Sequence, residues 1–460
     1  MAFNIESLTI KGLNAKTARL LFLAVVVFLV FYLIAWLPLA DSFFDGLKSL
    51  LFILMGMSFF VYSYIKYEDM FSPLAVYNLL WFFILAIGEL KLSALQGGLG
   101  PLAYALIFGS IMSFNLGASL FGKKGFVDTS GIEYIEKRKN NLLLAILLFF
   151  IASFSAAVIE SANSGFLFPF LSGDRNFKYI NYLHYLTMAQ SLVMFLCFVF
   201  LRTFKTNRKT IYLIFVLAII QAILFRNRWV LFMPVIGCFM YVNKYYGIKA
   251  KQMVTLGLML ILLLVGVGSV RMMIENVRIG ASPERSILTY GHVNKTGSQF
   301  LGWLNTYTVM SVQNFQNNIE QRQQFDKGLN TFGFILDLTL LDRLFNRENL
   351  GIDEKQLVYS GLGGNIVLST YLGELYADFG PIWVLIVPMF YGLFCGLMYR
   401  GYRSGKSMVW SYIYGIVLTM IIFSAFSSYF SRSGPFVFML MASSVVLILR
   451  LRLNILPMRE

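Results

Sequence analysis

The sequence predicts an all-α polytopic integral membrane protein, with about twelve transmembrane helices and one long extracytoplasmic loop. Three observations predict this fold class. Hydrophobic residues fill 58% of the 460 positions, whereas charged residues fill only 13%. The mean hydropathy is +0.70. Apolar stretches of about 17 to 23 residues recur along the chain, and each can cross a hydrocarbon core of about 30 Å as a helix.

The predicted spans are separated by short polar connections, except for one long interval. They cover, to within a few residues, 20–40, 48–65, 74–90, 99–121, 141–161, 183–201, 210–225, 229–245, 253–270, 380–399, 408–427 and 436–450. Helices are expected because lipid offers no hydrogen-bond partner to backbone N–H and C=O groups. The first span is too long for the core of a signal peptide, so we expect it to be retained. No soluble domain is interleaved, so residues 1–460 are predicted to form a single membrane domain.

The distribution of positive charge predicts the orientation of these spans. More than half of the 38 Lys and Arg residues fall in the segments that are cytoplasmic if the N-terminus lies inside, and the short outer loops hold few. This asymmetry satisfies the positive-inside rule and predicts that both termini are cytoplasmic. The net charge of +15 therefore indicates topology and contact with anionic lipid, not binding to nucleic acid.

The long interval, residues 271–379, is predicted to be an outer loop with structure of its own. It is too rich in apolar and aromatic residues to be disordered. In "FLGWLNTYTVMSVQNFQNNI", Trp303, Tyr307, Met310 and Phe315 share one helical face, as in an amphipathic helix. Such a helix could lie on the membrane or pack over the bundle. The following "GLGGNIVLSTYLGELYADFG" is expected to return the chain to the membrane as a helix or a re-entrant segment.

Several kinds of site have little support. The sequence lacks H-E-x-x-H, D-x-D and paired C-x-x-C patterns, so neither a metal nor a cofactor is predicted. Glu89 and Glu160 lie at outer span ends, and the deeper polar groups, such as Asn115, Gln190 and Gln221, are neutral. Ion-coupled transporters usually place ionisable groups at mid-membrane depth, so the sequence gives little support for proton or sodium coupling.

Charged residues that could bind a ligand are predicted on the outer face. They are Arg175, Arg226, Arg228, Arg271, Arg278 and Arg432, with the carboxylates Glu374 and Asp378. Arginines with few carboxylates suit a phosphate or pyrophosphate ligand, because a guanidinium binds such groups bidentately and stays protonated. Any single arginine could instead anchor a span end at the lipid headgroups. Arg226 and Arg228 are the strongest candidates, because a very short turn holds both beside the bundle.

The chain also resembles a known family. The resemblance rests on "MFSPLAVYNLLW", "GFLFPFLSGDR", "FRNRW", the long outer loop and, above all, "STYLGELYADFGPIWVLIVPMFYG". These segments are similar to the O-antigen, or oligosaccharide repeat-unit (Wzy-type), polymerases. The resemblance covers most of the chain, is diffuse, and implies a fold like that of the GT-C-type membrane glycosyltransferases.

The resemblance implies a metal-independent transferase in a bacterial plasma membrane. Two undecaprenyl-pyrophosphate-linked oligosaccharides, a donor and an acceptor, would react on the outer face, in a pathway that includes a flippase and a chain-length regulator. Arg226 and Arg228 would stabilise the departing pyrophosphate, and Asp378 or Glu374 would act as general base unless they cap or orient a helix. Substrate contacts would come from Arg175, Arg271, Arg278, Tyr371, Tyr376 and Arg432.

Two other functions remain open from the sequence. An O-antigen ligase has a similar plan and uses a histidine in its large outer loop, where this chain has His292 in "TYGHVNKT". A transporter or flippase for polysaccharide or another solute is the second alternative. A transporter needs a polar path from both faces, whereas a polymerase needs a cleft open to the outside and to lipid.

Overall fold

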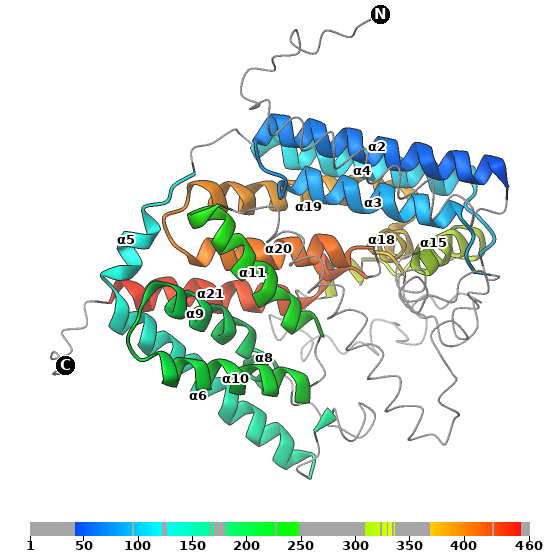
Figure 1. Ribbon diagram of the computed structural model, residues 1–460. Helices are drawn as coiled ribbons and strands as arrows, with labels where there is room; N and C mark the ends of the chain where they lie inside the picture. Colours follow the sequence, from blue (N-terminus) through cyan, green and yellow to red (C-terminus); the bar gives the residue numbers. More distant parts are fainter. Residues whose placement is uncertain are drawn as a thin grey trace, which may run out of the picture.

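The fold is given by a computed structural model, which describes residues 42–93, 96–121, 127–165, 168–169, 180, 182–225, 228–247, 309–322, 324–328, 330–333, 335, 369–425 and 427–451. Throughout these ranges the regular elements are helices and no strand occurs (Figure 1). The predicted all-α class is therefore confirmed for this part of the chain.

The helices follow the predicted spans closely. They are α2 (Phe43–Tyr67), α3 (Pro73–Glu89), α4 (Pro101–Phe121), α5 (Gly131–Glu136), α6 (Lys139–Asn163), α8 (Leu183–Thr187), α9 (Gln190–Thr203), α10 (Arg208–Leu224), α11 (Arg228–Tyr246), α15 (Met310–Gln321), α18 (Tyr371–Phe379), α19 (Pro381–Ser404), α20 (Val409–Phe423), the short 3-10 helix η7 (Tyr429–Ser431) and α21 (Ser433–Arg450). The predicted spans 20–40 and 253–270 lie outside the described residues.

The described helices make this a multi-pass membrane protein. By length and composition, α2, α4, α6, α19, α21 and the combined segment Leu183–Thr203 can each cross a bilayer, while α3 and α20 are apolar but shorter. The total of twelve spans stays a prediction. Large apolar side chains project outward where lipid would lie, for example Leu213 (60% exposed) and Tyr212 (53%) on α10.

The helices associate in two groups (Figure 1), which share one core of buried side chains. In one group α4 packs along α19 and α2 along α3; in the other α9 packs on α6, α10 and α11. Helix α20 contacts α3, α11 and α19, and α21 contacts α6, α8, α9 and α20, so these two helices link the groups. One continuous cluster of buried side chains, running from Tyr67 through Phe195 and Tyr412 to Leu449, fills the space between them.

Close approach of α4 and α19 depends on glycine. A Cβ atom on Gly117 would lie 1.9 Å from the carbonyl oxygen of Met389, and one on Gly392 would lie 2.1 Å from that of Phe114. Glycines spaced in this way let two spanning helices touch along their backbones, where dispersion contacts are strongest.

A helix break within the predicted span 183–201 separates α8 from α9. The carbonyl oxygen of Thr187 accepts hydrogen bonds from Ser153 Oγ (3.0 Å) and Gln221 Nε2 (3.0 Å). Gln221 Nε2 also donates to Ser153 Oγ at 2.9 Å. Ser153 and Gln221 therefore have a structural role inside the spans. Where a helix breaks in an apolar bundle, its free backbone groups need hydrogen-bond partners from other helices.

Helix α15 belongs to the bundle. Met310 and Phe315 are fully buried, and the helix contacts α4 and α18. The backbone N–H of Gly100 donates to Gln316 Oε1 at 2.8 Å, which fixes the helix to the chain before α4. Of the two predicted arrangements, packing over the bundle is therefore confirmed for 310–321. Trp303 and Tyr307 lie outside the described residues.

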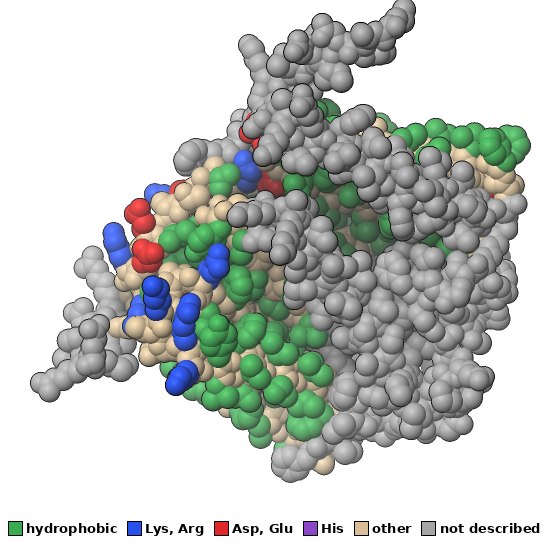
Figure 2. Space-filling model, in the orientation of Figure 1, with side chains coloured by type: hydrophobic (Ala, Val, Ile, Leu, Met, Phe, Trp, Pro, Cys, Tyr) green, Lys and Arg blue, Asp and Glu red, His purple; other side chains and the backbone are tan. Residues whose placement is uncertain are grey.

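Charged side chains divide the molecule into two ends. The basic end carries Lys66, Lys137, Arg138, Lys139, Arg202, Lys205, Arg208, Lys209, Lys244, Arg400, Arg403, Lys406 and Arg450. Lys and Arg side chains gather at this end, on the left in Figure 2. The opposite end holds α18 and α15, on the right in Figure 1, and is called the α18 end. The predicted orientation would place the basic end in the cytoplasm and the α18 end outside.

Candidate functional site at the α18 end

Helix α18 is a short element held between two capped termini. Thr370 is its N-cap, and the Thr370 Oγ1 atom accepts a hydrogen bond from the N–H of Gly373 at 3.2 Å. Gly380 follows the helix with φ of 73°, a conformation that favours glycine, and Pro381 then begins α19. The sharp turn brings α18 against the ends of α19 and α20, because the N–H of Tyr371 donates to the carbonyl of Ser424 (3.1 Å).

Glu374, in the first turn of α18, is fixed to the segment between α20 and α21. Its Oε1 atom accepts hydrogen bonds from the backbone N–H of Ser428 at 2.9 Å and from Ser427 Oγ at 3.1 Å. No contact in the described part of the chain engages Oε2. The side chain is 18% exposed, so one carboxylate oxygen is held in place while the other can receive a proton.

Arg432 lies beside this carboxylate and is open to solvent. Its Nη2 atom is 3.8 Å from Glu374 Oε1 and 3.4 Å from Ser427 Oγ, and 60% of its side chain is exposed. Arg432 is the residue just before α21 and follows the turn η7. A guanidinium placed in this way can bind an anion without leaving its carboxylate partner.

Burial raises the pKa of Glu374 above the usual glutamate value, and Arg432 and the hydrogen bonds from Ser427 and Ser428 oppose that rise. The carboxyl group is therefore a stronger base, once ionised, than an exposed glutamate. A base whose pKa moves toward neutrality is better matched to proton transfer from a hydroxyl group.

Asp378, the other predicted base, serves as a helix cap. It is fully buried. Its Oδ1 atom accepts from the backbone N–H of Asn330 (3.0 Å), and its Oδ2 atom accepts from the N–H of Thr331 (2.7 Å) and from the Thr331 hydroxyl group. These contacts satisfy the free N–H groups that begin the helical turn 330–333. Both carboxylate oxygens of Asp378 thus accept hydrogen bonds, and the residue caps a helix, which is the alternative role that the sequence analysis considered for it.

The two tyrosines predicted to meet sugar are packed inside the protein. Tyr371 is fully buried and its hydroxyl group is hydrogen-bonded to that of Tyr77. Tyr376 is 7% exposed, with the rings of Phe315 and Phe325 centred 6.1 Å away. A sugar could not stack on Tyr371 in this structure, because no part of that side chain reaches the surface.

Most of the predicted arginines lie where the structure does not describe side chains. Arg175, Arg226, Arg271 and Arg278 fall outside the described residues. Arg228 is the first residue of α11, at the α18 end, but its side chain is likewise not described. Arg432 is thus the predicted phosphate-binding arginine whose surroundings are known.

A second pair of ionisable side chains in contact at this end escaped the sequence analysis. Glu160, near the end of α6, is fully buried, and its Oε2 atom lies 3.3 Å from Nδ1 of His184 at the start of α8. The neighbouring Tyr185 is hydrogen-bonded to Ser433, which adjoins Arg432. Both Glu160 and His184 stand out in a chain with so few ionisable groups at the outer span ends, but nothing in their separation of 24 residues predicts the contact.

The site therefore combines an anchored carboxylate with one oxygen free of described contacts and an exposed guanidinium. Such a pair can accept a proton and hold an anion at the same end of the molecule. No protein-family model, no curated protein and no solved structure matches this chain.

Proposed function

We propose that this protein is a membrane glycosyltransferase that joins polyprenyl-pyrophosphate-linked oligosaccharide repeat units on the outer face of a bacterial plasma membrane. The observation that carries the proposal is the pairing of Glu374 with the exposed Arg432 at the α18 end, opposite the basic end. The similarity of "GELYADFG" and its neighbouring segments to repeat-unit polymerases supports the same function.

In the proposed reaction, Glu374 takes the proton from a hydroxyl group of the acceptor sugar. The hydroxyl oxygen attacks the anomeric carbon of the donor, a new glycosidic bond forms, and the bond between that carbon and the pyrophosphate oxygen breaks. The electron pair leaves with the lipid pyrophosphate. Arg432 then offsets the negative charge that develops on the leaving group, as a preorganised cation does.

Arg226 and Arg228 remain proposed ligands of the same pyrophosphate. Arg228 is the first residue of α11, and Arg226 lies two residues before it in the sequence. Three arginines around one pyrophosphate would supply the positive charge that a metal ion supplies in other transferases. Arg175, Arg271 and Arg278 remain proposed contacts to the rest of the lipid-linked substrate.

The test uses a host that lacks its own polymerase and supplies the matching repeat unit. Surface polysaccharide is resolved by length on a gel for wild type, Glu374→Gln, Arg432→Ala, Arg226→Ala and Arg228→Ala at matched protein levels. We expect a ladder from wild type and a single repeat unit from Glu374→Gln, because an amide cannot accept the proton. Each arginine variant should shorten or abolish the ladder, since removing one charge-stabilising donor costs about 10²- to 10³-fold in rate.

The control for this test is Lys48→Ala, which removes another cation from the α18 end. Lys48 is 56% exposed and lies 3.7 Å from Glu89, a carboxylate separate from the site. This variant should give a wild-type ladder. A wild-type protein that forms no ladder would contradict the polymerase function, and a normal ladder from Glu374→Gln would contradict the role of that residue as base.

A further inference from the structure

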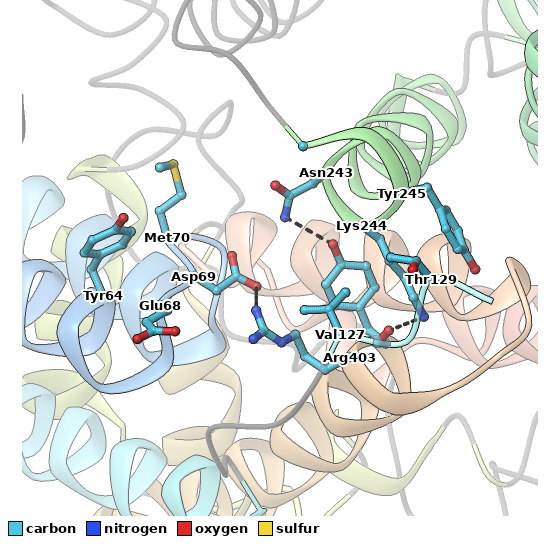
Figure 3. A pocket seen from close by; sticks show the side chains of 12 residues that line it. Tyr64, Glu68, Asp69, Met70, Val127, Thr129, Asn243, Lys244, Tyr245 and Arg403 are labelled. Atoms are coloured by element: carbon cyan, nitrogen blue, oxygen red, sulfur yellow. Dashed lines mark hydrogen bonds and ion pairs between the residues drawn. The ribbon is translucent and has the colours of Figure 1, made fainter. Parts of the chain in front are cut away.

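A cavity at the basic end has no part in the proposed reaction. Its volume is about 370 Å³, within the range of sites that bind small molecules. Its walls come from the ends of α2, α11 and α19 and from residues 127 and 129, just before α5 (Figure 3). Segments far apart in the sequence thus converge on one polar space at the end of the helix bundle.

One carboxylate in the wall of the cavity is already neutralised. Asp69 is 4% exposed, and its Oδ1 atom accepts from the N–H of Phe71 at 2.9 Å. The other oxygen, Oδ2, accepts from the Tyr399 hydroxyl group at 3.1 Å and lies 3.5 Å from Nη1 of Arg403. Both carboxylate oxygens of Asp69 therefore have partners within the protein, and we do not expect this residue to bind a ligand.

Lys244, on the opposite wall of the cavity, has no carboxylate of the described residues in contact with it. Lys244 is 4% exposed, and its Nζ atom donates to the carbonyl oxygens of Tyr402 (2.6 Å) and Gly405 (2.5 Å) at the end of α19. Among the described residues no carboxylate lies within ion-pair distance of this ammonium. The ring centroids of Tyr245 and Tyr402 lie 5.4 Å and 5.7 Å from Nζ, and Asp128 attracts the charge from a greater distance. A buried ammonium without a carboxylate in contact favours an anion in the cavity, because a buried charge that lacks a close counter-ion is costly.

The carboxylate of Glu68 and the ammonium of Lys244 lie on different sides of the cavity. The exposed carboxylate of Glu68 lies at the end of α2, on the far side of Arg403 from Lys244 (Figure 3). The surrounding basic end attracts anions from solution and from the membrane surface. A molecule with a phosphate at one end and a hydroxyl group at the other could therefore bind with its phosphate toward Lys244.

We propose that this cavity binds the phosphate of a polar headgroup, and that the ligand is a membrane phospholipid. The site is built from the ends of α2 and α19, two helices long and apolar enough to span a bilayer, so it lies where lipid phosphates are found. A soluble phosphate compound shares the same chemistry and is distinguished by experiment. The inference does not depend on the reaction at the α18 end.

The test is native mass spectrometry of the purified full-length protein in detergent and phosphate-free buffer. The probes are dihexanoyl phosphatidylglycerol, glycerol 3-phosphate, inorganic phosphate and dihexanoylglycerol, which lacks the phosphate. We expect phosphatidylglycerol to bind and dihexanoylglycerol not to bind. Lys244→Met should weaken phosphatidylglycerol binding at least about ten-fold, because a charge-assisted hydrogen bond is lost.

A second variant tests the site in case Lys244→Met does not fold. Thr129 is exposed at the edge of the cavity, so Thr129→Glu should fold and should repel the phosphate, whereas Thr129→Gln should bind like wild type. Lys209→Met removes an exposed cation of the basic end that does not line the cavity, and should also bind like wild type.

Each outcome of this comparison has a definite meaning. Binding of phosphatidylglycerol that Thr129→Glu weakens and Thr129→Gln retains would support the proposed lipid site. Equal affinity for glycerol 3-phosphate or inorganic phosphate would overturn the lipid as ligand and leave a soluble phosphate compound in its place. Absence of phosphate-dependent binding, or equal binding by wild type and Thr129→Glu, would overturn the site.

Discussion

At the scale of single residues, the two carboxylates of α18 differ in what surrounds them. Asp378 and Glu374 are one helical turn apart, yet Asp378 accepts hydrogen bonds with both oxygens, while Glu374 does so with one. The free energy of a cap comes from satisfying N–H groups that would otherwise be buried without partners. A base needs an unoccupied oxygen. The same residue type thus takes two roles, which depend on the segments that fold against it.

The protonation of Glu374 predicts how activity depends on pH. Burial raises its pKa, and a general base works only when ionised, so the polymerisation rate should rise as the pH rises through that raised pKa. The rise should occur above the ordinary glutamate value of about 4.3. The measurement is the rate of repeat-unit joining between pH 4 and 9 in membranes from cells that express wild type. Persistence of the same rise in the residual activity of Glu374→Gln would show that another group titrates.

At the scale of helices, the spans were predictable because a run of apolar residues is a local property of the sequence. The break between α8 and α9 was not, since it depends on hydrogen bonds from Ser153 and Gln221 on two other helices. The contacts within the candidate site could not be predicted for the same reason. Glu374 and Ser428 are 54 residues apart, and Glu160 and His184 belong to different helices. Sequence spacing indicates which end of the molecule a residue occupies, but not which partner it meets there.

The close contact between α4 and α19 leaves no room for a side chain at Gly392. Gly392→Ala should lower the free energy of unfolding by about 1 to 3 kcal/mol, because the added methyl group would overlap the carbonyl of Phe114 and push the helices apart. Gly88→Ala is the control, since a Cβ there would meet Val309 at an ordinary 3.7 Å and alanine favours a helix. The measurement is the thermal unfolding midpoint in detergent. Equal midpoints for wild type and Gly392→Ala would mean that the two helices can separate without cost.

At the scale of the whole molecule, the functional proposals depend on which end faces which side of the membrane. The described chain alternates between the basic end and the α18 end at each spanning helix, so a single orientation assigns both sites. The orientation predicted by the positive-inside rule would place the cavity lined by Lys244 at the cytoplasmic leaflet and Glu374 with Arg432 on the outer surface. Lipid-linked repeat units presented on the outer surface would reach only the second of these sites.

This orientation can be measured by cysteine labelling in intact cells. Lys209 at the basic end and Gln324 near α18 are both exposed, so a cysteine at either position should react with a maleimide that reaches it. We expect a membrane-impermeant maleimide to label Gln324→Cys in intact cells and Lys209→Cys only after permeabilisation. Wild type measures the background from Cys197, Cys238 and Cys395, of which the first and last are buried. The reverse pattern would place Glu374 in the cytoplasm, where a polymerase acting on the outer surface cannot use it, and would contradict the proposed function without affecting the phosphate cavity.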